Sequence, residues 1–181
     1  GLSYANDVNN PVIFFIYMVK GTKNSLCIEY NEGNYNENGW LLSDVERFVN
    51  EIGIHDGNDR GTSANGLGGK SALQALMDND PETYYKLICK FGDETITHKI
   101  YSDYAYEKVD TNQDPSYNKG FTRFVIPLSD KRLDEYNNDK NTIISDLMRY
   151  TNNKYCEFII ENKSYVPEPN IPTLDSIGGP E

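Results

Sequence analysis

The residues of this chain best suited to bind an anion lie in a glycine-rich stretch, NGLGGKSALQAL, at Asn65–Leu76. Three glycines fall within four residues, and Lys70 and Ser71 follow at the start of an apolar helical pattern. Glycines let a backbone approach a ligand closely, and the free N–H groups at a helix N-terminus favour negative charge. The spacing therefore predicts a loop that binds phosphate.

Two further interpretations of this loop stay open. From Ala64, the letters ANGLGGKS have the spacing of a Walker P-loop with Ala in place of the first Gly, which would assign Lys70 to phosphate and Ser71 to Mg²⁺. A P-loop follows a buried strand directly, whereas the polar letters IHDGNDRGTS precede this one. The third interpretation is a plain glycine-rich connection into a helix, since glycines are common in loops.

Length and charge limit the class of protein. A chain of 181 residues, 38% hydrophobic and 12% aromatic, is long enough for one domain with a real core. The net charge of −11 repels phosphate, so we expect no direct nucleic-acid binding by this domain. The longest apolar run, Pro11–Val19, is too short to span a bilayer and lacks the flanks of a signal peptide. We expect a soluble protein of the cytoplasm, or of the nucleus in a eukaryote, with no membrane partner.

Cysteines and histidines are sparse. Cys27, Cys89 and Cys156 stand far apart, and the only histidines are His55 and His98. Because these residues do not occur in the paired spacing of a zinc site, we expect no zinc site. We expect reduced thiols in or near the core instead.

Apolar patterns predict an α+β fold, a two-layer sandwich of helices on a mixed β-sheet. The first two strands are expected to form a hairpin, Val12–Lys20 and Leu26–Tyr30. Because Val12–Lys20 is a continuous apolar run, we expect it to be buried on both faces. Further strands are expected at Tyr84–Lys90, Thr95–Asp103, Ala105–Val109, Phe121–Leu128 and Lys154–Asn162. Helices are expected before Pro11, after an N-cap at Ser43, from Ser71 to Met77 and at Asp139–Tyr150. Residues 1–165 form the domain, and 166–181 are a Pro-rich tail or linker.

The letters GLGGKSA, Gly66–Ala72, resemble the glycine box of the GHKL ATPases, nearest to those of the Microrchidia and type II topoisomerase groups. The superfamily also includes MutL proteins, heat-shock chaperones and histidine kinases. The resemblance implies ATP and Mg²⁺ as cofactors, bound under a Gly-rich lid at 53–69. Phosphate contacts would come from Asn65, Gly66, Leu67, Gly68, Gly69, Lys70 and Ser71.

Other segments follow the order of that family. Asn6, in YANDVNN, resembles the asparagine that binds Mg²⁺. Asn31, Glu32 and Gly33 follow the second strand, where the family reads adenine, and Thr122 resembles the threonine of a late strand near the adenine or the lid. In an alternative register Tyr35, Asn36 and Glu37 would face the adenine.

The chain departs from the family at two functional positions. The general base would stand four residues before Asn6, where this chain has Leu2, which does no acid–base chemistry. Asn31 or Glu32 takes the place of the aspartate that accepts from the adenine amine. The resemblance thus implies ATP binding and leaves hydrolysis open. It also implies a homodimer and further domains of a larger protein. The alternatives are a P-loop NTPase and a degenerate, non-catalytic interaction domain.

Overall fold

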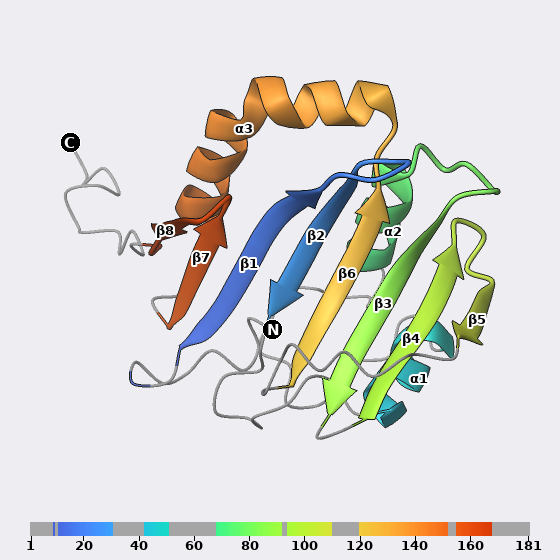
Figure 1. Cartoon of the computed structure of the whole chain (residues 1–181). Coiled ribbons are helices and arrows are strands. Elements are labelled where there is room, and N and C mark those ends of the chain that lie inside the picture. Colours follow the sequence, from blue (N-terminus) through green and yellow to red (C-terminus); the bar gives the residue numbers. More distant parts are fainter. Residues whose placement is uncertain are drawn as a thin grey trace, which may run out of the picture.

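A computed structural model describes residues 9, 11–30, 42–50, 68–91, 94–109, 120–151 and 155–167. These residues form a mixed eight-stranded sheet in the order β5-β4-β3-β6-β2-β1-β7-β8 (Figure 1). Strands β1 and β7 run parallel, and every other neighbouring pair is antiparallel. The strands are β1 (Val12–Val19), β2 (Ser25–Tyr30), β3 (Tyr84–Phe91), β4 (Glu94–Tyr101), β5 (Tyr106–Val109), β6 (Phe121–Pro127), β7 (Cys156–Ile160) and β8 (Lys163–Tyr165).

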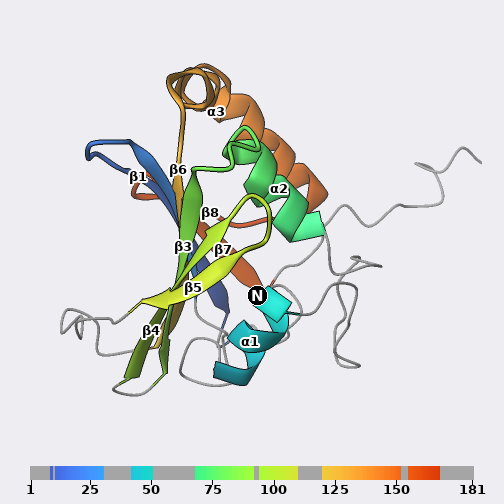
Figure 2. The same ribbon diagram turned by 90° about the vertical axis from the view of Figure 1, so that its right-hand side faces the viewer.

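Helices of the described part lie on one face of this sheet (Figure 2). They are α1 (Leu42–Asn50), α2 (Gly68–Leu76) and α3 (Asp130–Tyr150). The predicted α+β class, with helices packed on a mixed sheet, is confirmed. The predicted strands are confirmed as well, to within two residues at either end. None of the helices described is long and apolar enough to cross a membrane.

The core lies between the helices and the sheet face that they cover. Alternate residues of each strand point to opposite faces, so Leu87 of β3 and Phe124 and Ile126 of β6 share this inner face. Val45 of α1 and Leu73 of α2 complete the same apolar cluster from the helices. Burial of this cluster is what fixes α1 and α2 over the sheet.

One prediction about β1 was wrong. The apolar run was expected to be buried on both faces, but only alternate residues such as Val12 and Phe14 are buried. Phe15 and Val19 of the other face are 38% and 45% exposed. The reason is that the described helices cover a single face, which an apolar run by itself cannot reveal.

The helix starts also differ from the predictions. Helix α2 begins at Gly68 rather than Ser71, so two glycines belong to its first turn. Helix α3 begins at Asp130, well before Asp139, because Ser129 caps it by accepting a hydrogen bond from the Arg132 N–H at 3.3 Å. Ser43 lies inside α1 and is not its N-cap. Strand β8 was not predicted.

The described residues include all three cysteines, which are buried, as expected, and form no disulfide with one another. The helix predicted before Pro11 lies outside the described residues apart from Asn9. The same holds for the presumed lid up to Leu67 and for the tail from residue 168 onward.

Candidate functional site

The first turn of α2 consists of Gly68, Gly69 and Lys70 in helical conformation, followed by Ser71. The N–H groups at the start of a helix lack partners within it, and the helix dipole places partial positive charge there. No acidic side chain stands in this first turn. An anion at this end of α2 would therefore meet backbone donors without a competing carboxylate from the turn itself.

Lys70 is buried rather than solvated, with 5% of the residue exposed. Its ammonium lies 5.0 Å from the centroid of the Phe48 ring of α1. This distance is within the range of a cation–π interaction, which stabilises a positive charge away from bulk water. The side chain thus points toward α1 and places its charge between the two helices.

Phe48 connects this charge to the sheet. Its ring packs edge-on against Phe124 of β6, with centroids 5.9 Å apart. Thr122 stands two residues earlier on the same face of β6 and is completely buried. Lys70 is therefore linked through the Phe48 ring to Phe124, which is two residues after Thr122 on β6.

Thr122 also lies beside the end of β2. In the register of β2 and β6, Thr122 is opposite Tyr30, the last residue of β2, and on its other side it is opposite Cys89 of β3. The segment Asn31–Gly33 follows Tyr30 directly in the chain. The described part of β2 therefore ends at Tyr30, beside Thr122, and Asn31–Gly33 lie outside the described residues.

The predicted site residues divide into three groups. Lys70 and Thr122 are buried on the inner side of the fold, and the backbone of Gly68 and Gly69 forms the start of α2. Ser71 is exposed, so its hydroxyl faces solvent. The predicted residues that lie outside the described part are Asn6, Asn31, Glu32, Gly33, Asn65, Gly66 and Leu67.

Sequence reasoning missed Phe48 as a site residue. Its helical spacing with Val45 and Val49 marked it as a core position, and it does pack against the core. Its contact with the Lys70 ammonium depends on how α1 and α2 sit together, which no local pattern encodes.

Two hydrogen bonds fix the helices that carry the site. The Gln74 side-chain amide of α2 donates to the Ser102 carbonyl in the turn between β4 and β5. The Tyr106 hydroxyl of β5 donates to the Asn50 side-chain oxygen at the end of α1. Both helices are thus tied to the same side of the sheet, which keeps Phe48 and Lys70 in a defined position.

His98 of β4 lies under α1 and is 3% exposed. Burial lowers its pKa, and the nearby Lys108 lowers it further, whereas Glu46 of α1 raises it. Its Nδ1 has no hydrogen-bond partner in the part of the chain described. These conditions keep the imidazole neutral at pH 7.

Metal-binding groups are not assembled within the described ranges, where no three His, Cys, Asp or Glu side chains could hold a metal ion together. The Mg²⁺ ligand expected from the resemblance, Asn6, lies outside those ranges. Mg²⁺ commonly keeps several waters and needs only one or two protein ligands besides substrate phosphates, so a single amide oxygen fits its chemistry.

No protein-family model and no curated protein matches this chain. The resemblance to the GHKL glycine box therefore rests on the residues of the chain itself.

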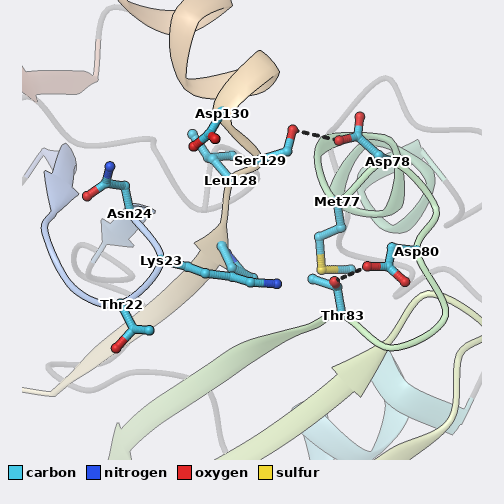
Figure 3. A pocket seen from close by; sticks show the side chains of 11 residues that line it. Thr22, Lys23, Asn24, Met77, Asp78, Asp80, Thr83, Leu128, Ser129 and Asp130 are labelled. Atoms are coloured by element: carbon cyan, nitrogen blue, oxygen red, sulfur yellow. Dashed lines mark hydrogen bonds between the residues drawn. The ribbon is translucent and has the colours of Figure 1, made fainter.

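A separate cavity of about 400 Å³ lies at the opposite end of the sheet (Figure 3). It is lined from three connections, Thr22–Asn24, Met77–Thr83 and Pro127–Asp130. Pro127 and Thr122 mark the two ends of β6, so this cavity is distinct from the region around Lys70. Two of its acidic side chains have partners: Asp78 accepts from Ser129 at 2.7 Å and from Arg132 at 2.8 Å, and Asp80 accepts from Thr83 at 2.8 Å.

Proposed function

We propose that this chain is a GHKL-type module that binds Mg-ATP at the N-terminus of α2. The N–H groups from Gly68 to Ser71 and the Lys70 ammonium would contact the phosphates. Thr122 and the segment Asn31–Gly33 would contact the adenine, and Asn6 would hold Mg²⁺.

The observation that supports this proposal is the burial of Lys70 beside the glycine-bearing helix start, with its ammonium over the Phe48 ring, which packs against Phe124, two residues after Thr122 on β6. Within the described residues, the Lys70 ammonium keeps its charge away from bulk water, over the Phe48 ring. A phosphate group interacts more strongly with such a cation than with a solvated lysine, because the local dielectric constant is lower.

The sequence favours this type of site over a P-loop. A P-loop connects a buried strand directly to the helix that follows. The letters IHDGNDRGTS that precede the glycines are polar and unlike a buried strand. The glycines therefore fit a lid that closes onto a helix start, the arrangement implied by the GHKL resemblance.

The proposed activity is nucleotide binding coupled to a change of the lid at 53–69, with dimerisation as the response. A nucleotide shifts such an equilibrium only by its difference in affinity for the open and closed states. Lys70 follows the lid segment in the chain, so a change of the lid would supply that difference. Hydrolysis is not included, because Leu2 stands where the family has its general base.

Calorimetric titration with ATP, with and without Mg²⁺, tests the proposal. Lys70→Met keeps the aliphatic stem and removes the charge, and we expect it to weaken ATP binding by about 10–150-fold, the equivalent of one charge-assisted hydrogen bond of about 1.5–3 kcal/mol. The matched control is Lys163→Met, because the Lys163 ammonium also lies over an aromatic ring, that of Tyr165 at 5.5 Å, but on the distant β8. Absence of ATP binding by the wild-type chain would refute the proposal, as would equal affinities of the two variants.

A further inference from the structure

The sheet face opposite the helices carries a cluster of lysines and tyrosines on β3 and β4. Leu87 and His98 point toward the helices, so their neighbours in the strands point to the other face. On that face Tyr84 is opposite Tyr101, and Lys86 is opposite Lys99. We call these four residues the β3–β4 patch.

The placement of Lys86 opposite Lys99 is unfavourable for the isolated domain. Like charges directly opposite each other on antiparallel strands destabilise the pair. Lys99 is compensated by Glu107, whose Oε1 lies 3.3 Å from the Lys99 Nζ, and by the Tyr84 ring at 4.9 Å. Lys86 is exposed and forms no ion pair within the described part of the chain. A chain with a surplus of eleven acidic residues nevertheless keeps an uncompensated lysine at this position.

A hollow of about 530 Å³ adjoins Lys86 on this face. It runs between the β1–β2 turn, β3 and β6, and its lining includes Lys23, Ser25, Glu82, Thr83, Tyr84 and Lys86. Lys23 also lines the cavity of Figure 3, where its side chain extends toward Thr83. Two ammonium groups and several hydroxyl groups thus line one hollow that has a single acidic side chain, Glu82.

Elsewhere on this face, among the described residues, a cation and a carboxylate pair with each other. There Arg123 of β6 donates to Glu29 of β2 at 2.9 Å, and both side chains are nearly buried. Lys86 is therefore the exposed lysine of this patch that a partner's carboxylate could pair with, and Lys23, which also lies near Asp80, lines the hollow beside it.

We propose that the β3–β4 patch and the adjoining hollow dock an acidic segment of a partner polypeptide. Carboxylates of that segment would pair with Lys86 and Lys23, and its apolar groups would pack on the Tyr84 and Tyr101 rings, whose centroids are 5.3 Å apart. The site lies on the opposite face of the sheet from Lys70 and Thr122, so it does not depend on nucleotide binding.

A polypeptide suits this surface better than a nucleic acid does. A nucleic acid carries a phosphate at every nucleotide, and its regular charge would meet the field of a chain with net charge −11. An acidic peptide can place a few carboxylates at the lysines and neutral residues elsewhere. Serine and threonine hydroxyls in the hollow can also donate to carboxylates.

A fluorescence-anisotropy titration tests the proposal. The probe is a labelled short peptide of alternating glutamate and alanine, and the competitor is a dT oligonucleotide of equal charge. We expect the peptide to bind, and we expect Lys86→Glu to weaken binding by about tenfold or more, since it removes one attraction and adds one repulsion. Lys163→Glu, the same charge change at an exposed lysine of β8, should leave the affinity within about twofold.

Thermal unfolding of the same variants shows whether a loss of peptide binding comes from a loss of stability. Lys86→Glu replaces a like-charge pair with an opposite-charge pair across from Lys99, so we expect its unfolding midpoint to rise while peptide binding falls. The proposal is overturned if the wild-type chain does not bind the peptide or if the two glutamate variants lose affinity equally. Tighter binding of the oligonucleotide than of the peptide overturns it as well.

Discussion

Replacement of Gly68 by Ala is expected to change stability and ATP affinity in opposite directions. Gly68 is the first helical residue of α2, and its backbone is helical. Alanine is preferred over glycine in a helix by up to about 1 kcal/mol, less at a terminus, so the free energy of unfolding should stay the same or rise slightly. If the Gly68 N–H contacts phosphate, the added methyl group keeps the phosphate from approaching it.

The expected loss of affinity follows from that one contact. A hydrogen bond to a charged group contributes about 1.5–3 kcal/mol, so ATP binding should weaken by about 10–150-fold. Calorimetric titration gives the affinity, and urea denaturation gives the free energy of unfolding. If Gly68 had only a structural role, Gly68→Ala would lose ATP affinity only to the extent that it lost stability.

Ala75→Gly is the matched control. Ala75 is exposed near the other end of α2, so glycine there should lower the free energy of unfolding by up to about 1 kcal/mol and leave ATP affinity unchanged. The reasoning is refuted if Gly68→Ala binds ATP as well as the wild-type chain does. It is also refuted if both variants lose affinity in proportion to their stability.

Three further predictions concern the rest of the fold. Glu29→Gln removes the negative charge opposite the nearly buried Arg123 and should lower the free energy of unfolding in urea by up to about 3–5 kcal/mol. A change below about 1 kcal/mol would contradict the role given to this pair. Burial lowers the pKa of His98, so the unfolded chain takes up its proton first. Stability that is fully present above about pH 6.5 should therefore be lost as the pH falls below that value, and a smaller acid sensitivity of His98→Gln in parallel denaturation curves would confirm it. Burial raises the pKa of the Cys156 thiol to about 11, and all three cysteines are buried, so a thiol reagent should react slowly with the native chain and rapidly in urea; fast reaction of the native chain would show an accessible thiol.

Local patterns were enough to predict most elements of the sheet. The hairpin of β1 and β2 follows from two β-branched, aromatic segments separated by GTKNS, and the spacing of apolar residues shows the body of α2. The start of α3 was missed because DKRLDEYNND is mostly polar, although Ser129 before it is a typical cap residue.

Strand β8 illustrates a different difficulty. It follows β7 through a two-residue turn in which Glu161 and Asn162 both have positive φ, 48° and 69°. Asn is common at such positions but Glu is not, so only one of the two turn residues indicates a tight turn from its type. A short strand after such a turn could not be recognised from the sequence.

The candidate site was predictable only in part. Glycines before a helix indicate an anion site locally, whereas the contact of Lys70 with Phe48 depends on the packing of α1 against α2. The adjacency of Tyr30 and Thr122 depends on the register of two strands that are far apart in sequence. Such non-local relations arise from the burial of the whole core, which one sequence does not reveal.

The location of bound ATP tests the central claim most directly. In two-dimensional NMR of the isotope-labelled chain titrated with Mg-ATP, we expect the largest shifts of backbone amide signals at Gly68–Ser71, with Tyr30 and Thr122 shifted as well. Signals of Thr22–Asn24, at the cavity on the opposite end of the sheet, should stay in place. Shifts centred on that cavity, or none at the start of α2, would contradict a nucleotide site at Lys70.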